Sequence, residues 1–146
     1  MDKPTYDDVN LILKLYEIRR EPRLRDARSW LSKLSAGALT ELQAQNPPGS
    51  DGDASFRMAA TYWDMAASFI TGGVLNQELF LESGGELLFT WAKISHLIPD
   101  LRAAMGSPRY LSNLETVATA AIKRMNRDNP GAYEAFSARV RGVPAR

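Results

Sequence analysis

The chain has 146 residues, with 18 Lys and Arg against 17 Asp and Glu, which gives a formal net charge of +1. This length suits one domain with a buried core. The sequence contains no Cys and a single His, so it excludes disulfides, thiolate metal sites, a Cys nucleophile and any site that needs two imidazoles from one chain. We therefore expect no bound metal and no cofactor, and a role other than catalysis.

The most apolar window covers residues 58–75 and carries Asp64 near its middle. An aspartate at the centre of a bilayer costs roughly 2.5–3.5 kcal/mol, and the window is shorter than the ~20 residues of a membrane-spanning helix. The window is therefore interpreted as a buried helix of a globular core. Residues 1–8 are acidic and polar, unlike a signal peptide. We expect a cytoplasmic protein that makes no contact with a membrane.

The first predicted helix covers residues 6–20. Thr5 is a suitable N-cap, and Asp8, three residues later, completes an acidic form of the capping box. The segment is apolar over most of its surface and has one narrow polar stripe, which is formed by Asn10, Lys14, Glu17 and Glu21. This pattern predicts a helix that is otherwise surrounded by protein.

A second helix is predicted over residues 23–34, after Pro22, and a short third helix over residues 38–45. Residues 46–53 follow, with two prolines, two glycines and no apolar side chain. This composition predicts a flexible loop.

The fourth predicted helix, residues 54–71, dominates the pattern. Its polar side chains are spaced four, three, four and three residues apart, and nearly everything between them is apolar or small; they are Arg57, Thr61, Asp64, Ser68 and Thr71. A helix with so narrow a polar stripe is buried on nearly all sides, so we expect it to be the central helix of the fold.

Five further helices are expected, over residues 76–82, 86–98 and 99–105, from Ser107 to about residue 127, and from Asn129 onward, before a tail at 142–146. No segment alternates with a period of two residues. The chain is therefore predicted to form one all-α domain over residues 1–146, an irregular bundle of about seven to nine helices around residues 54–71.

The patterns of common catalytic and phosphate-binding sites are missing. The only histidine, His96, has Lys93 three residues before it, so the Glu-x-x-His pattern of di-iron bundles is absent. No phosphate-binding glycine loop and no nucleophile elbow occurs. We expect His96 to bond to a backbone group or to a carboxylate.

Two carboxylates fall on predicted apolar faces: Asp64 on the central helix, and Glu115 beside Leu111 and Ala118. A buried carboxylate requires a partner, and Arg is well suited because its planar fork matches the two oxygens. At least one pair is therefore expected between these carboxylates and the candidate arginines Arg19, Arg20, Arg23 and Arg102. Together with Arg57, these residues form a predicted buried polar cluster, which is an ion-pair network or the lining of a small-molecule pocket.

Five arginines fall within residues 19–28, beside two acidic residues. Basic clusters of this kind bind phosphate backbones when they share one face. The nearly neutral chain argues against this use, so nucleic acid is not the expected partner.

Several short phrases occur together in this chain. They are LYEIRR at 15–20, YWDM at 62–65, GGVLN at 72–76, LFL at 79–81, Trp91 with Lys93, and NLE at 113–115. With them the chain resembles, over about residues 6–125, a family of bacterial helical proteins catalogued only as a domain of unknown function. The resemblance implies an all-helical fold and a bacterial origin. It implies no activity and no site residue.

The leading functional hypothesis is a non-enzymatic module that self-associates, as a dimer, or binds another protein. Near-continuous apolar helices and a set of Trp, Tyr and Arg side chains, which are enriched at interfaces, favour it. The first alternative is a small-ligand-binding bundle with a polar pocket near Arg57, Asp64 and Glu115. The second is a weak nucleic-acid binder that uses residues 19–28.

Overall fold

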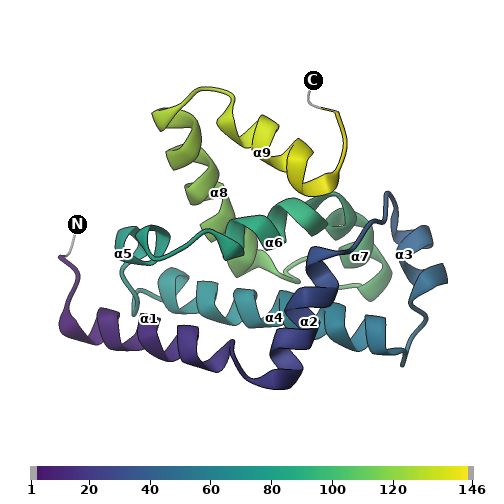
Figure 1. The fold of residues 1–146 in the computed structure, drawn as a ribbon, viewed down its shortest axis with the longest axis horizontal. Helices are drawn as coiled ribbons and strands as arrows, with labels where there is room; N and C mark the ends of the chain where they lie inside the picture. Colours follow the sequence, from purple (N-terminus) through teal and green to yellow (C-terminus); the bar gives the residue numbers. More distant parts are fainter. Residues whose placement is uncertain (1–2, 145–146) are drawn as a thin grey trace.

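The computed structural model describes residues 3–144, and within this range the chain forms nine α-helices and one 3-10 helix, with no strand. The predicted all-α fold is therefore confirmed (Figure 1). The elements are α1 (Tyr6–Ile18), α2 (Pro22–Ser32), α3 (Leu39–Gln45), α4 (Asp51–Thr71), α5 (Gln77–Glu82), α6 (Glu86–Ile94), η1 (Ser95–Leu97), α7 (Ile98–Met105), α8 (Ser112–Asp128) and α9 (Ala132–Arg141). Among the described helices, none combines the length and the hydropathy needed to cross a bilayer.

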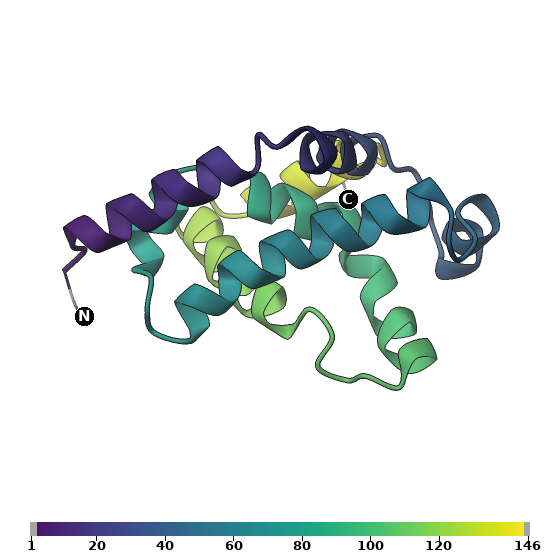
Figure 2. The ribbon, with the colours of Figure 1, turned by 90° about the horizontal axis from the view of Figure 1, so that it is seen from below.

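Helix α4 is the central helix, as predicted. It runs along the length of the molecule, with α2 crossing one side and α8 packing on another (Figures 1 and 2). Alanine makes these close approaches possible, because Ala59, Ala60, Ala66 and Ala67 of α4 and Ala27 of α2 are all fully buried. Small side chains let two helix backbones approach, so that dispersion contacts are made along their whole length.

Helix α8 begins later in the chain than the sequence predicts. The predicted start is Ser107, an N-cap residue that is followed by proline. Residues 107–111 form turns, and α8 begins at Ser112 after Leu111, which has a φ of 58°. A leucine in the left-handed region costs roughly 1–2 kcal/mol. The Leu111 side chain is 3% exposed, so burial of its apolar surface offsets this cost. The last helix is shifted in the same way: α9 begins after Gly131, whose φ is 81°.

The predicted flexible loop is shorter than residues 46–53. Helix α4 begins at Asp51, three residues before its predicted start, because the Ser50 hydroxyl accepts a hydrogen bond from the Asp53 amide at 3.2 Å. Gly52 is buried against Asn46, and a Cβ atom at Gly52 would lie 1.8 Å from Asn46 Oδ1. The glycine that was expected to loosen this segment therefore lets it pack. Of the expected tail, residues 142–144 follow α9, whereas 145–146 lie outside the described residues.

Helix α1 departs most from prediction. Its capping box is confirmed: the Thr5 hydroxyl accepts from the Asp8 amide, and the Asp8 carboxylate accepts from the Thr5 amide at 2.6 Å. The expectation that protein surrounds the helix is wrong. It lies along one edge of the molecule and buries only Asp8 and Leu15 (Figures 1 and 2). The Tyr62 hydroxyl of α4 donates a short hydrogen bond to the Leu15 carbonyl and holds the inner face of α1 in place.

Asp8 joins two parts of the chain that are far apart in sequence. Besides capping α1, its carboxylate accepts from the amide of Asn76, the N-cap residue of α5, at 2.9 Å. The backbone hydrogen bonds from Thr5, and then from Asn76, hold the pKa of the Asp8 carboxyl below its ordinary value.

A lowered pKa means that the ionised carboxylate stabilises the fold above the ordinary aspartate pKa, and that this contribution is lost as the pH falls through the folded-state value. We therefore expect Asp8→Asn to have a lower urea midpoint than the wild type at pH 7. The difference between the two proteins should shrink as the pH falls below about 4. Urea unfolding at pH 7 and pH 3 tests this, and a gap that is equally wide at both values would contradict the assignment.

Candidate functional site

Two residues of the polar stripe of the central helix, Asp64 and Thr71, hold the start of α8. Asp64 Oδ1 accepts the backbone amide of Leu114, in the first turn of α8, at 2.9 Å. The Thr71 hydroxyl donates to Asn113 Oδ1 at 2.7 Å. Since α8 has no side-chain cap of its own, Asp64 supplies from another helix the acceptor that an N-cap residue would provide. Asp64 thus satisfies a backbone amide, and no arginine pairs with it among the described residues.

The predicted carboxylate–arginine pair is found at Glu115. Arg102 Nη2 donates to Glu115 Oε1 at 3.0 Å, while Arg102 Nε donates to the Tyr110 carbonyl at 2.8 Å. The expected burial of this carboxylate is wrong, because the Glu115 side chain is 45% exposed. The pair therefore ties α7 to the start of α8 at the surface.

Arg57 lies apart from that pair. Its side chain is 61% exposed and contacts Asp53, one turn earlier on α4, at 3.3 Å. It lines a cleft of about 660 Å³ between α3, α4 and α7, whose described lining includes Tyr110 but neither Asp64 nor Glu115. The three residues predicted to share one pocket therefore lie at separate places, Arg57 and Asp64 on α4 and Glu115 on α8.

Of the arginines predicted to pair with a carboxylate, Arg19 faces Glu86, beside Arg28. Neither Arg28 nor Glu86 was predicted to pair. Arg28 donates to both carboxylate oxygens of Glu86, at 2.6 and 2.5 Å, and Arg19 lies 3.7 Å from the same carboxylate. Arg28 also donates to the Arg19 carbonyl at 3.0 Å. The bidentate bond to Glu86 raises the pKa of Arg28. This network ties the α1–α2 corner to the first residue of α6.

The other two candidate arginines lie elsewhere. Arg20 is exposed, and Arg23 Nη1 contacts the Ser55 hydroxyl at 3.4 Å. Because Glu86 neutralises part of the charge on Arg19 and Arg28, residues 19–28 present less positive charge than the sequence suggests. Arg28 and Glu86 are 58 residues apart in the sequence. No pattern beside either residue indicates the pair, so the sequence did not predict it.

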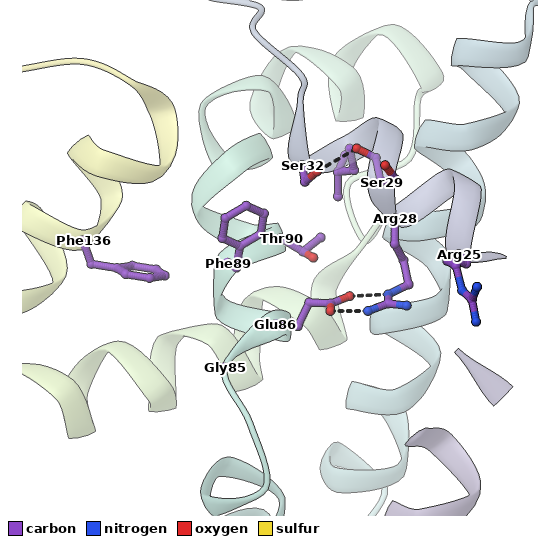
Figure 3. Close-up of a pocket in the computed structure, with 10 residues that line it drawn as sticks. Arg25, Arg28, Ser29, Ser32, Gly85, Glu86, Phe89, Thr90 and Phe136 are labelled. Atoms are coloured by element: carbon purple, nitrogen blue, oxygen red, sulfur yellow. Dashed lines mark hydrogen bonds and ion pairs between the residues drawn. The ribbon is translucent and has the colours of Figure 1, made fainter. Parts of the chain in front are cut away.

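A second cleft, of about 610 Å³, lies between α2 and α9 and is also lined by α6. Figure 3 shows Phe136 projecting from α9 toward Phe89 of α6, with Ser29 and Ser32 on the opposite wall. The Arg28–Glu86 pair closes one end, and the Ser32 hydroxyl donates to the Ser29 carbonyl at 2.7 Å. Several polar groups of this cleft are therefore already bonded to one another.

The outer face of α1 carries four exposed apolar side chains with helical spacing. Tyr6, Val9, Leu13 and Tyr16 are 78%, 40%, 59% and 53% exposed. The guanidinium of Arg19 lies 4.3 Å from the centroid of the Tyr16 ring, a cation–π contact that fixes the ring at the surface. These four residues are called the outer stripe below. A contiguous apolar patch on a folded surface is characteristic of an interaction site.

The lone histidine has the backbone bond that was expected. His96 Nε2 lies 2.7 Å from the Ala36 carbonyl, so this nitrogen carries the proton and donates. No group of three or more His, Cys, Asp or Glu side chains among residues 3–144 is placed to hold a metal ion.

A family model matches residues 4–125. The chain belongs to the family described as Domain of unknown function (DUF4760). No curated protein and no solved structure matches it. The match covers α1 to α7 and most of α8, so the outer stripe, Glu86 and both faces of α4 lie inside the family region, whereas α9 lies beyond it.

The Arg28–Glu86 pair should be a strong contact between distant segments, because both side chains are largely buried, at 22% and 27% exposed, and the geometry is bidentate. In a double-mutant cycle of Arg28→Met and Glu86→Gln, we expect a coupling energy of about 1–3 kcal/mol in the free energy of urea unfolding. Arg25→Met, at an exposed arginine of the same helix, is the control and should change the stability by less than about 0.5 kcal/mol. A coupling energy near zero would refute the pairing.

Proposed function

We propose that this protein is a non-enzymatic module that self-associates as a homodimer through the outer stripe of α1. The observation that carries the proposal is the exposure of Tyr6, Val9, Leu13 and Tyr16 on the helix face turned away from the core. The inner face of the same helix is already used, by Leu15 and Asp8. A helix with apolar side chains on two faces gains from a second helix on the open one.

The spacing of the outer stripe fits another helix as its partner. Its residues are three, four and three apart, the alternation of the a and d positions of a heptad. In an antiparallel pair of α1 helices, Tyr6 of one copy meets Tyr16 of the other, and Val9 meets Leu13. Every apolar residue of the stripe then has an apolar partner, and one two-fold axis relates the copies.

The charges beside the stripe favour a second copy of this chain in the antiparallel orientation. Lys3 precedes the stripe, Glu17 borders its far end, and both are exposed. In an antiparallel pair each Lys3 comes near the partner's Glu17. A parallel pair would place like charges together. Antiparallel helices also place the positive end of each macrodipole beside the negative end of the other.

The size of the stripe sets the expected affinity. Stable interfaces bury about 800 Å² per partner, and one face of a 13-residue helix offers less than that. We therefore propose a weak dimer with a dissociation constant on the order of micromolar. The setting that we propose for this association is the bacterial cytoplasm.

Leu13 lies in the middle of the stripe and is 59% exposed, so Leu13→Glu should disrupt association without unfolding the chain. Two buried glutamates near a two-fold axis should weaken the dimer by at least about tenfold. Sedimentation velocity over a concentration series from about 1 to 300 µM measures this effect.

The matched control is Met105→Glu, which introduces the same charge at a methionine that is 54% exposed, on α7. We expect this variant to associate as the wild type does. A wild-type protein that stays monomeric over the whole concentration series, or equal losses in both variants, would contradict the proposal.

A further inference from the structure

The cleft that contains Arg57 has the form of a small-molecule site and is separate from the outer stripe. It occupies about 660 Å³ between α3, the first half of α4 and α7, within the ~300–1,000 Å³ range usual for ligand pockets. Its walls are largely apolar; they include Leu39, Leu42, Phe56, Met58, Leu101 and Met105. Methionine side chains adapt in shape, and their sulfur atoms make favourable contacts with aromatic rings.

Two hydrogen-bond donors of this cleft, the Arg57 guanidinium and the Tyr110 hydroxyl, meet a single acceptor, Asp53, among the described residues. Among residues 3–144, the one hydrogen bond of the Arg57 guanidinium runs from Nη2 to Asp53, at 3.3 Å. No acceptor is found for the Tyr110 hydroxyl within the same range. Burial raises the pKa of Tyr110, so its phenol keeps its proton at neutral pH and remains a donor. A cation and a phenolic O–H lining one cleft match an anionic acceptor.

The backbone of Tyr110 is held by its surroundings. Arg102 Nε donates to the Tyr110 carbonyl at 2.8 Å, and the next residue, Leu111, is buried in its left-handed conformation. A segment held in this way loses little conformational freedom when a ligand binds.

We propose that this cleft binds an aromatic carboxylate, with the carboxylate on Arg57 and Tyr110 and the rings between Met58 and Met105. In the free protein, Asp53 occupies part of the position of that carboxylate. Its Oδ2 atom accepts from Arg57 and, at 3.1 Å, from the Gly49 amide. The ligand therefore competes with Asp53 for the guanidinium, and the two residues have opposite effects on binding.

The test uses 2-naphthoate, titrated into the full chain by isothermal calorimetry in the Leu13→Glu background, so that self-association does not contribute heat. Arg57→Gln removes the cation and should raise the dissociation constant by about 10- to 100-fold, because a hydrogen bond to a charged group contributes about 1.5–3 kcal/mol. Asp53→Asn removes the competing carboxylate and should lower it by about two- to fivefold. Arg109→Gln, at an exposed arginine outside the lining, is the matched control and should have no effect.

Two further probes define the ligand class. Naphthalene-2-methanol keeps the rings without the charge, octanoate keeps the charge without the rings, and both should bind at least tenfold more weakly than 2-naphthoate. Circular dichroism checks that each variant is folded. The proposal is overturned if 2-naphthoate shows no saturable binding up to about 1 mM, if either further probe binds as tightly, or if Arg57→Gln and Asp53→Asn change the affinity in the same direction.

Discussion

The burial of α4 between α2 and α8 is the constraint on which the rest of the molecule depends. Its alanines allow both neighbours to approach closely, and its polar stripe is left with two tasks. Asp64 and Thr71 hold the start of α8, while Arg57 opens onto the cleft beside α7. Helix α4 takes the central position, and α1 lies at the edge of the molecule.

Patterns local in sequence predicted the helices, the capping box at Thr5 and the central position of α4. They failed where a distant residue decides the local structure. The start of α8 depends on Asp64, 50 residues earlier, and the α1–α2 corner depends on Glu86. Neither contact leaves a sign beside the residue that it stabilises.

The apolar surface of α1 shows a different limit of sequence reasoning. Its composition alone predicts burial, because most apolar side chains of a folded chain lie inside it. The alternation of three and four residues along the outer stripe does not distinguish a helix covered by its own chain from one covered by another chain. Only the position of α1 at the edge separates the two cases. The sequence likewise could not assign the roles of the predicted site residues. Asp64 caps α8, Glu115 forms a surface ion pair, and Arg57 lines a cleft.

The central claim, an antiparallel pair of α1 helices, is tested most directly by disulfide crosslinking, because the chain has no cysteine of its own. With Tyr6 opposite Tyr16, Asn10 lies close to its counterpart beside the two-fold axis. The two copies of Glu17 are about 18 Å apart along the helix axes, at 1.5 Å per residue. Under mild oxidation, Asn10→Cys should form a covalent dimer rapidly and Glu17→Cys should not. Equal crosslinking of both variants, or of neither, would contradict the account.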